Sequence, residues 1–128
     1  MYKVITFVLC ALMPMVSVAG ETKIVSFKTL LSENRVHLTQ LKLNMTRQEL
    51  DELMGNIAAK TRNGLVPNPY RVDIIERSNK NYEVLYYINR KYPPFTNIKL
   101  SQTMPVILHE GRVIGWGRDK LNQIRYEE

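Results

Sequence analysis

LKLNMTRQELDELMG, residues 41–55, predicts a short helix whose two ends are both encoded in the sequence. Thr46 stands where an N-cap hydroxyl belongs, and Glu49 follows three residues later. This is the spacing of a capping box, in which each side chain accepts a hydrogen bond from the other residue's backbone N–H. Met45 and Leu50 have the spacing of a hydrophobic staple around the cap. The pattern therefore predicts a helix that begins directly after Thr46.

The predicted helix, residues 46–54, carries one apolar stripe. Leu50, Leu53 and Met54 follow one another at i, i+3 and i+4, so they share a helical face. Gly55 stands at the end, where glycine can adopt the left-handed conformation that terminates many helices. A helix this short is unstable by itself. We therefore expect the stripe to pack against a neighbouring helix and a sheet.

An earlier helix is predicted over residues 32–43, with Ser32 at its N-cap. Apolar side chains recur on one face of this helix, at Leu31, Leu38 and Leu41. Asn44 then ends the helix, because asparagine tolerates the left-handed conformation better than any residue except glycine. We expect the two helices to form an αα-hairpin across Leu43–Met45.

Two β-hairpins are predicted, at residues 70–91 and 104–117, because runs of β-branched and aromatic residues flank short turns there. Turn dipeptides predict long loops at 56–70 and 91–103. The strand at the end of the first hairpin is apolar on both faces, with Val84, Tyr86 and Ile88 on one and Leu85 and Tyr87 on the other. It should therefore be central in a sheet and covered on each side. Residues 118–128 are either a helical turn or an extended edge segment.

Residues 1–19 are typical of a secretory signal peptide. Lys3 is their only charged residue, an apolar run follows it, and small residues precede the expected cleavage after Ala19 or Gly20. A membrane anchor is the alternative interpretation. Pro14 interrupts the run, and about 20 apolar residues are needed to span a bilayer, so a cleaved signal is favoured.

The mature domain, residues 20–128, is expected to be a single exported, periplasmic domain. Leu9 precedes Cys10, so the lipobox of a lipoprotein is missing, and lipid anchoring is not expected. The net formal charge is +6 for the whole chain, and +5 once Lys3 is removed. A basic exported domain favours an envelope protein or an anionic lipid surface as its partner, and disfavours nucleic acid. The alternative is that the charge serves only solubility.

The helical segment resembles the signature of the SmpA/OmlA (BamE-like) bacterial envelope domain family. The residues that carry the resemblance are Leu38, Leu41, Asn44, Met45, Thr46, Glu49, Leu50, Leu53 and Gly55. Asn44 replaces the glycine usual in that family. The C-terminal half, with residues 68–70 and 104–117, is closer to uncharacterised envelope members.

The resemblance implies an α+β fold, with a two-helix hairpin packed on one face of a small antiparallel sheet of three to four strands. It also implies a binding or scaffold module that acts by protein–protein contact, in outer-membrane protein assembly or envelope maintenance. The missing lipobox departs from the membrane tethering of the lipoprotein in that family. A shared fold does not transfer a partner, because function resides in sites built on the fold.

Catalytic motifs are missing from the sequence, which has no GxSxG turn and no Gly-rich phosphate loop. His37 and His109 lack the spacing of a metal site, so neither a metal nor a cofactor is expected. Glu49, Asp51 and Glu52 cluster where capping and the helix dipole explain them. We therefore predict a protein that is not an enzyme.

Binding is predicted on the long loops and on a basic, aromatic surface at one end of the sheet, with a solvated face as the alternative. The candidate binding residues are Asn68, Tyr70, Arg71, Arg90, Tyr92, Arg112 and Trp116. An exposed strand edge is a second docking surface. The alternative function is binding of a lipid or small apolar ligand in a cavity lined by Tyr86, Tyr87 and Trp116. Otherwise the indole of Trp116 should fill the core.

Overall fold

The computed structural model describes residues 21–91 and 97–126, and the predicted signal peptide with Cys10 lies outside these ranges. The elements are β1 (Lys23–Ser26), α2 (Phe27–Leu38), α3 (Arg47–Met54), β2 (Ile57–Thr61), β3 (Gly64–Pro67), β4 (Arg71–Arg77), β5 (Lys80–Ile88), the 3-10 turn η2 (Leu100–Gln102), β6 (Thr103–His109), β7 (Arg112–Trp116) and α4 (Arg118–Arg125). Over the described ranges the fold is α+β, with three α-helices and two sheets instead of the predicted single sheet.

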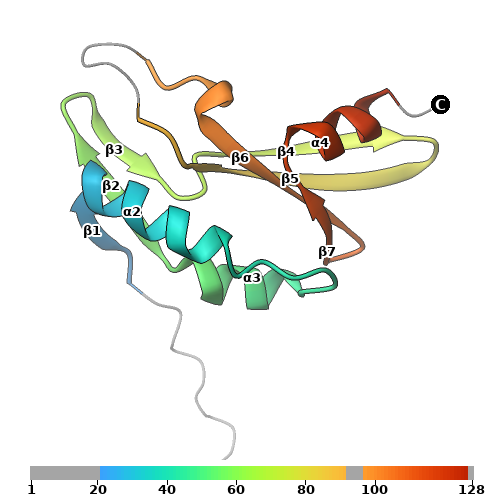
Figure 1. Ribbon diagram of the computed structural model, residues 1–128, viewed down its shortest axis with the longest axis horizontal. Coiled ribbons are helices and arrows are strands. Elements are labelled where there is room, and N and C mark those ends of the chain that lie inside the picture. Colours follow the sequence, from blue (N-terminus) through green and yellow to red (C-terminus); the bar gives the residue numbers. More distant parts are fainter. Residues whose placement is uncertain (1–20, 92–96, 127–128) are drawn as a thin grey trace, which may run out of the picture.

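The larger sheet is antiparallel and has the strand order β4-β5-β6-β7 (Figure 1). Both predicted hairpins are present in it. Their turns are Ser78-Asn79 and Glu110-Gly111, where every residue has a positive φ between 52° and 78°. Two-residue turns with positive φ match the right-handed twist of the strands they join, so they set the pairing of β4 with β5 and of β6 with β7.

The smaller sheet has the order β1-β2-β3, with β2 parallel to β1 and antiparallel to β3. The predicted loop over residues 56–70 is therefore wrong. Asn63 does lie in a turn, but the turn joins two strands. Ala58 and Ala59 gave no strand signal because alanine is a weak strand former. Their pairing with β1, more than thirty positions earlier in the chain, makes them a strand.

Helix α2 begins at Phe27 and not at the predicted residue 32. The hydroxyl of Ser26 accepts a hydrogen bond from the Thr29 N–H at 3.1 Å, so Ser26 is the N-cap. Ser32 lies inside the helix and is exposed. The helix ends at Leu38, earlier than predicted. Asn44 follows only after a turn, although it has the expected left-handed conformation, with φ 71°.

Helix α3 confirms the prediction for residues 46–54. The Thr46 hydroxyl accepts from the Glu49 N–H at 3.1 Å, and the Glu49 carboxylate accepts from the Thr46 N–H at 2.9 Å. Gly55 follows the helix with φ 82°. Leu50 and Met54 are fully buried. The helix therefore has both the predicted ends and the predicted apolar stripe.

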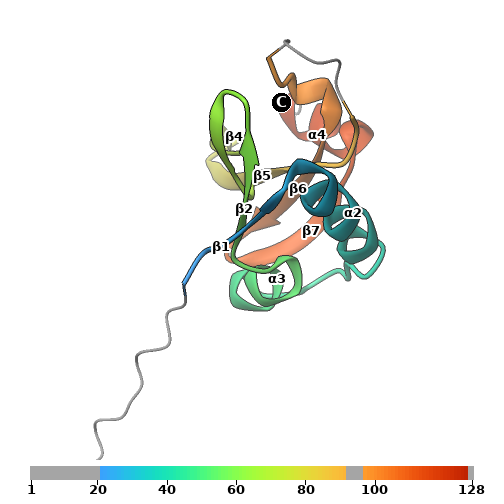
Figure 2. The ribbon, with the colours of Figure 1, turned by 90° about the vertical axis from the view of Figure 1, so that its left-hand side faces the viewer.

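The larger sheet is covered on both faces, as predicted for β5. On one face, Leu50 and Met54 of α3 pack with Leu85, Tyr87, Val106 and Leu108. On the other face, Leu121 and Ile124 of α4 pack with Tyr82, Val84, Tyr86 and Ile107. Figure 2 shows α3 and α4 on opposite sides of this sheet. The C-terminal segment is therefore a docked helix and not an edge strand.

Helix α2 packs mainly against the smaller sheet. Leu30 and Leu31 share a cluster with Ile57, Ala59 and Val66 of that sheet and with Ile88 of β5. Leu41, after the helix, belongs to the same cluster as Leu50 of α3. Ile88 is the last residue of β5, so its side chain joins the larger sheet to the core of the smaller sheet. No helix among the described residues is long and apolar enough to cross a membrane.

Candidate functional site

The predicted basic surface does not gather at one end of the sheet. Arg71 lies opposite Tyr86 in the β4–β5 ladder. Arg112 lies opposite His109, which in turn lies opposite Tyr82. Tyr82 and Tyr86 are separated by about 13 Å along β5. Arg71 and Arg112 are therefore at opposite ends of the sheet, and the prediction that placed them together is wrong.

Arg112 anchors the link between the helices. Its guanidinium donates to the Asn44 carbonyl at 2.9 Å. The Asn44 N–H donates to the Val113 carbonyl, and the Val113 N–H donates to the Met45 carbonyl, both at 2.8 Å. The hinge segment, residues 44–47, thus pairs with the outer side of β7. Arg112 has a structural role in this pairing, and the hinge segment covers one edge of the larger sheet.

Asn68 is also a structural residue. Asn34 of α2 is fully buried, and its amide and that of Asn68 donate to each other at 2.9 and 3.1 Å. Asn34 also donates to the Ile88 carbonyl at 2.9 Å. The amide pair therefore fixes α2 to the segment between β3 and β4, where the Asn68–Pro69 peptide bond is cis.

The other predicted binding residues do not converge. Tyr70 is half-buried against the cluster of the smaller sheet, beside Ile98. Arg90 is exposed, and Tyr92 lies outside the described residues. Trp116 is 37% exposed, so the expectation that its indole fills the core is wrong.

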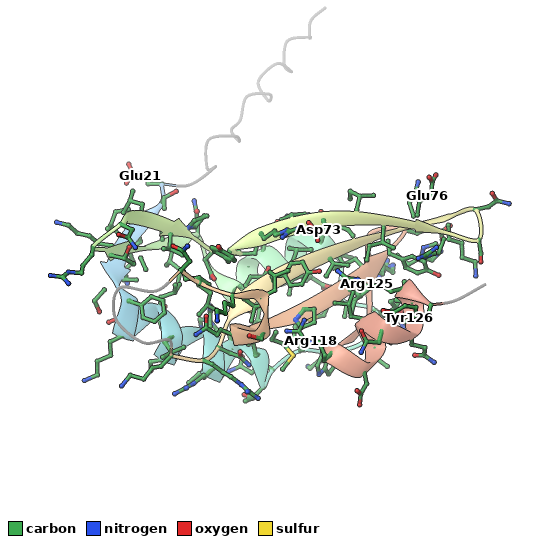
Figure 3. All side chains as sticks on the ribbon, turned by 90° about the horizontal axis from the view of Figure 1, so that it is seen from above. Glu21, Asp73, Glu76, Arg118, Arg125 and Tyr126 are labelled. Atoms are coloured by element: carbon green, nitrogen blue, oxygen red, sulfur yellow. The ribbon has the colours of Figure 1, made fainter. Side chains whose placement is uncertain are left out.

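The predicted cavity lined by Tyr86, Tyr87 and Trp116 does not form, because the two tyrosine side chains lie in clusters on opposite faces of the sheet. Arg125 donates to the Tyr86 hydroxyl at 3.2 Å. Burial, and then the negative charge of Asp73, raise the pKa of Tyr86. Asp73 also binds Arg71 at 2.8 Å. Figure 3 shows Asp73 of β4 beside Arg125 of α4. Arg71 is therefore held in a local cluster on the α4 face.

The free edge of the larger sheet is β4, which has β5 as its only strand partner in the described part of the chain. Two of its aliphatic side chains, Val72 and Ile74, are 45% and 66% exposed. They lie opposite Leu85 and Glu83, so they are on the α3 face. Helix α3 packs over β5, β6 and β7 and leaves these two side chains uncovered. The result is an apolar ledge, Val72 and Ile74, beside an unpaired strand edge.

A groove of about 720 Å³ lies next to this ledge, between the outer side of α3 and the Asn68–Pro69 segment. Arg47 of α3 forms ion pairs with Asp51, at 3.1 Å, and with Glu83 of β5. Burial lowers the pKa of Arg47. The hydrogen bonds and charges of the two carboxylates raise it by a larger amount, so the net shift of the pKa is upward. The ion pairs thus tie α3 to β5 along the groove.

Tyr87 lies at the floor of the groove. Its side chain is 1% exposed, and its ring packs in the core with Leu85 and Val106. Burial raises the pKa of Tyr87 most strongly, and the nearby carboxylate of Asp51 raises it further. Among residues 21–91 and 97–126 the Tyr87 hydroxyl has no hydrogen-bond partner, and it is not one of the fully buried unpaired polar atoms, because it reaches the groove. A tyrosine with a buried ring therefore presents a hydroxyl without a protein partner to the groove.

The sequence did not identify this groove. Val72 and Ile74 are two residues apart in the first strand of the predicted hairpin, so they share one face of that strand. The spacing does not say whether that face is exposed or packed. Their exposure in the structure supports an exposed strand edge, the second docking surface predicted above. Arg47, Asp51 and Tyr87 come from separate parts of the chain, and only the packing of α3 on the sheet brings them together.

The described residues contain no group of three or more histidine, cysteine, aspartate or glutamate side chains that could hold a metal ion. No protein-family model, curated protein or solved structure matches this chain. The resemblance to the SmpA/OmlA family therefore rests on the helical signature alone.

Proposed function

We propose that this chain is a non-enzymatic protein-binding module of the bacterial envelope, of the SmpA/OmlA kind, that acts after export and removal of residues 1–19. It binds an extended segment of a partner protein along β4. One observation carries this proposal: the hinge segment covers the β7 edge, whereas the β4 edge is open and has Val72 and Ile74 exposed beside it. Exposed apolar edge strands are templates for strand addition.

The two other open edges are less suitable for strand addition. β1 and β3 have four residues each, whereas β4 has seven. A longer edge offers more backbone hydrogen bonds to an incoming strand, and very short edge strands are one of the devices that discourage such pairing. The charged residues Arg71 and Arg77 at the two ends of β4 limit uncontrolled self-association.

In this proposal α2 and α3 form the two-helix hairpin that the family resemblance implies, and the hairpin serves as a clamp. The shared cluster of Leu41, Leu50 and Met54 supports the clamp, as does the pairing of the hinge segment with β7. The clamp holds α3 over β5, which keeps β4 uncovered. The surface that takes the added strand is β4 and not the hairpin.

Site-specific photo-crosslinking in cells tests the proposal. A photoreactive amino acid at position 74 is expected to crosslink to an envelope protein through one extended segment of that protein. The matched control is position 36, because Val36 of α2 is 54% exposed and lies away from β4. An additional Val72→Lys substitution should abolish the crosslink from position 74, because a charge on the ledge opposes strand addition.

Crosslinks that form at position 36 and not at position 74 would contradict the proposal. The lipid alternative is tested by sedimentation with vesicles of phosphatidylcholine and phosphatidylglycerol. Binding to these vesicles that survives Val72→Lys, without any protein crosslink at position 74, would favour the anionic lipid surface over the protein partner.

A further inference from the structure

The groove beside β4 carries an excess of negative charge. Asp51 and Glu52 line it, and Glu83 lies at the ion pair with Arg47, which is the only cation among these four residues. Asp51 is 54% exposed at its side chain, so its carboxylate still has access to solvent. Within the described part of the chain, Glu52 accepts a hydrogen bond only from the neutral amide of Gln48, at 3.3 Å. Both carboxylates can therefore accept further hydrogen bonds.

Tyr87 gives a second, independent indication of a ligand. Polar groups at the edge of a core usually have a hydrogen-bond partner from the protein, from water or from a ligand. Tyr87 as a whole is 1% exposed and lines the groove, and its hydroxyl opens onto the groove without a partner among the described residues. Burial raises the pKa of Tyr87 most, the carboxylates of Asp51 and Glu83 raise it further, and Arg47 lowers it. The effect of Asp51 alone exceeds that of Arg47, so the charges around the hydroxyl favour a cation there.

We propose that the groove is a binding site for the ammonium group of a lysine side chain, which the Tyr87 hydroxyl and the Asp51 and Glu52 carboxylates accept. An ammonium is a compact charge with three donors, so it can serve all three acceptors. An arginine of the partner is a less suitable ligand, because the guanidinium of Arg47 already lies between Asp51 and Glu83. An anionic ligand would be repelled by the excess of carboxylates.

The lysine belongs to the segment that binds along β4, and only this part of the inference rests on the proposed function. Val72 lies opposite Leu85, and Tyr87 lies two residues farther along the same face of β5. A strand added to β4 is about 10 Å from β5, two strand spacings away. An extended lysine side chain can cover most of that distance. The groove would then select segments with a lysine at one register position.

A titration followed by NMR tests the site without any partner protein. The probe is Nα-acetyl-lysine methylamide, and the control probe is Nα-acetyl-norleucine methylamide, which has a similar stem without the charge. We expect the lysine probe to shift the amide resonances of Asp51, Gly55 and Asn56 to saturation, with a dissociation constant on the order of millimolar. The norleucine probe should leave these resonances in place.

Two variants locate the acceptors. Tyr87→Phe keeps the buried ring, and Asp51→Asn keeps the shape of the side chain, and each should weaken binding of the lysine probe by about fivefold or more. The matched control is Asp119→Asn, because Asp119 is exposed on α4, which covers the opposite face of the larger sheet. Equal shifts with both probes, or unchanged affinity in both groove variants, would overturn the assignment.

The two proposals fail separately. Val72→Glu, like Val72→Lys, places a charge on the ledge and should abolish the crosslink from position 74. It adds no ammonium group beside the groove, so binding of the lysine probe should remain. If the probe binds and no protein crosslinks at position 74, the groove site stands and docking on β4 is wrong. If the crosslink forms and the probe does not bind, docking on β4 stands and the groove site is wrong.

Discussion

The guanidinium of Arg112 donates a hydrogen bond to the backbone carbonyl of Asn44, across 2.9 Å, and thereby joins β7 to the link between two helices. Asn44 has a positive φ of 71°, which turns the chain so that its carbonyl faces β7. The next carbonyl, that of Met45, also accepts a hydrogen bond from β7, from the Val113 N–H. The hinge segment therefore acts as a short additional strand, and this explains why β7 is a protected edge.

Arg112→Met should destabilise the protein by about 1 kcal/mol, because the substitution keeps the aliphatic stem but removes one donor from the Asn44 carbonyl. Urea denaturation gives the free energy of unfolding. Arg77→Met is the control, since Arg77 lies exposed at the end of β4. A larger loss in the control than in Arg112→Met would contradict the anchoring role.

The start of α2 can be tested by two serine substitutions. Ser26→Ala should cost about 1 kcal/mol, because it removes the N-cap hydroxyl that accepts from the Thr29 N–H. Ser32→Ala should change the stability little or raise it slightly, because alanine is the better helix former in an exposed helix interior. If the two costs were reversed, the helix would begin at the position predicted from the sequence.

The buried amide pair predicts a strong coupling between Asn34 and Asn68. Asn34→Ala should cost about 2 kcal/mol or more, because the Ile88 carbonyl and the Asn68 side chain lose their donor in a buried site. The double variant Asn34→Ala/Asn68→Ala should cost less than the sum of the single variants, because both remove the same pair of hydrogen bonds. Strict additivity in chemical denaturation would show that the two amides act independently.

Tyr87 predicts a loss of stability at alkaline pH. An unfolded tyrosine ionises near pH 10, whereas burial raises the pKa of Tyr87 above that value in the folded state. The contribution of Tyr87 is therefore complete below pH 10, and it falls as the pH rises further, by up to about 1.4 kcal/mol per pH unit. Tyr87→Phe should flatten this slope in denaturation curves between pH 9 and 11. Tyr126→Phe, at an 80% exposed tyrosine, should leave the slope unchanged.

The features that the sequence predicted correctly are those that depend on near neighbours. The capping box of Thr46 and Glu49 spans three residues, and the Glu110-Gly111 turn joins adjacent strands, so local chemistry determines both. The double-sided apolar pattern of β5 reports burial on each face, and the structure has a helix on each face. These predictions did not require knowledge of the tertiary structure.

The features that the sequence missed depend on distant partners. Ala58 and Ala59 become a strand only because β1 pairs with them. Trp116 is partly exposed although its large apolar area predicted a core position. The groove combines Arg47 of α3 with Tyr87 of β5, and no short-range pattern connects these residues. Arg112 and Asn68 were predicted as binding residues, but their partners, Asn44 and Asn34, give them structural roles.

Amide hydrogen exchange tests the central claim, the docking of an extended segment on β4, most directly. The measurement compares the free protein with the complex that is crosslinked from position 74. If a segment docks on β4, backbone amides within Arg71–Arg77 exchange more slowly in the complex, while those of β1 and β3 keep their rates. Slower exchange in α2 or in residues 44–47, with no change in Arg71–Arg77, would contradict it.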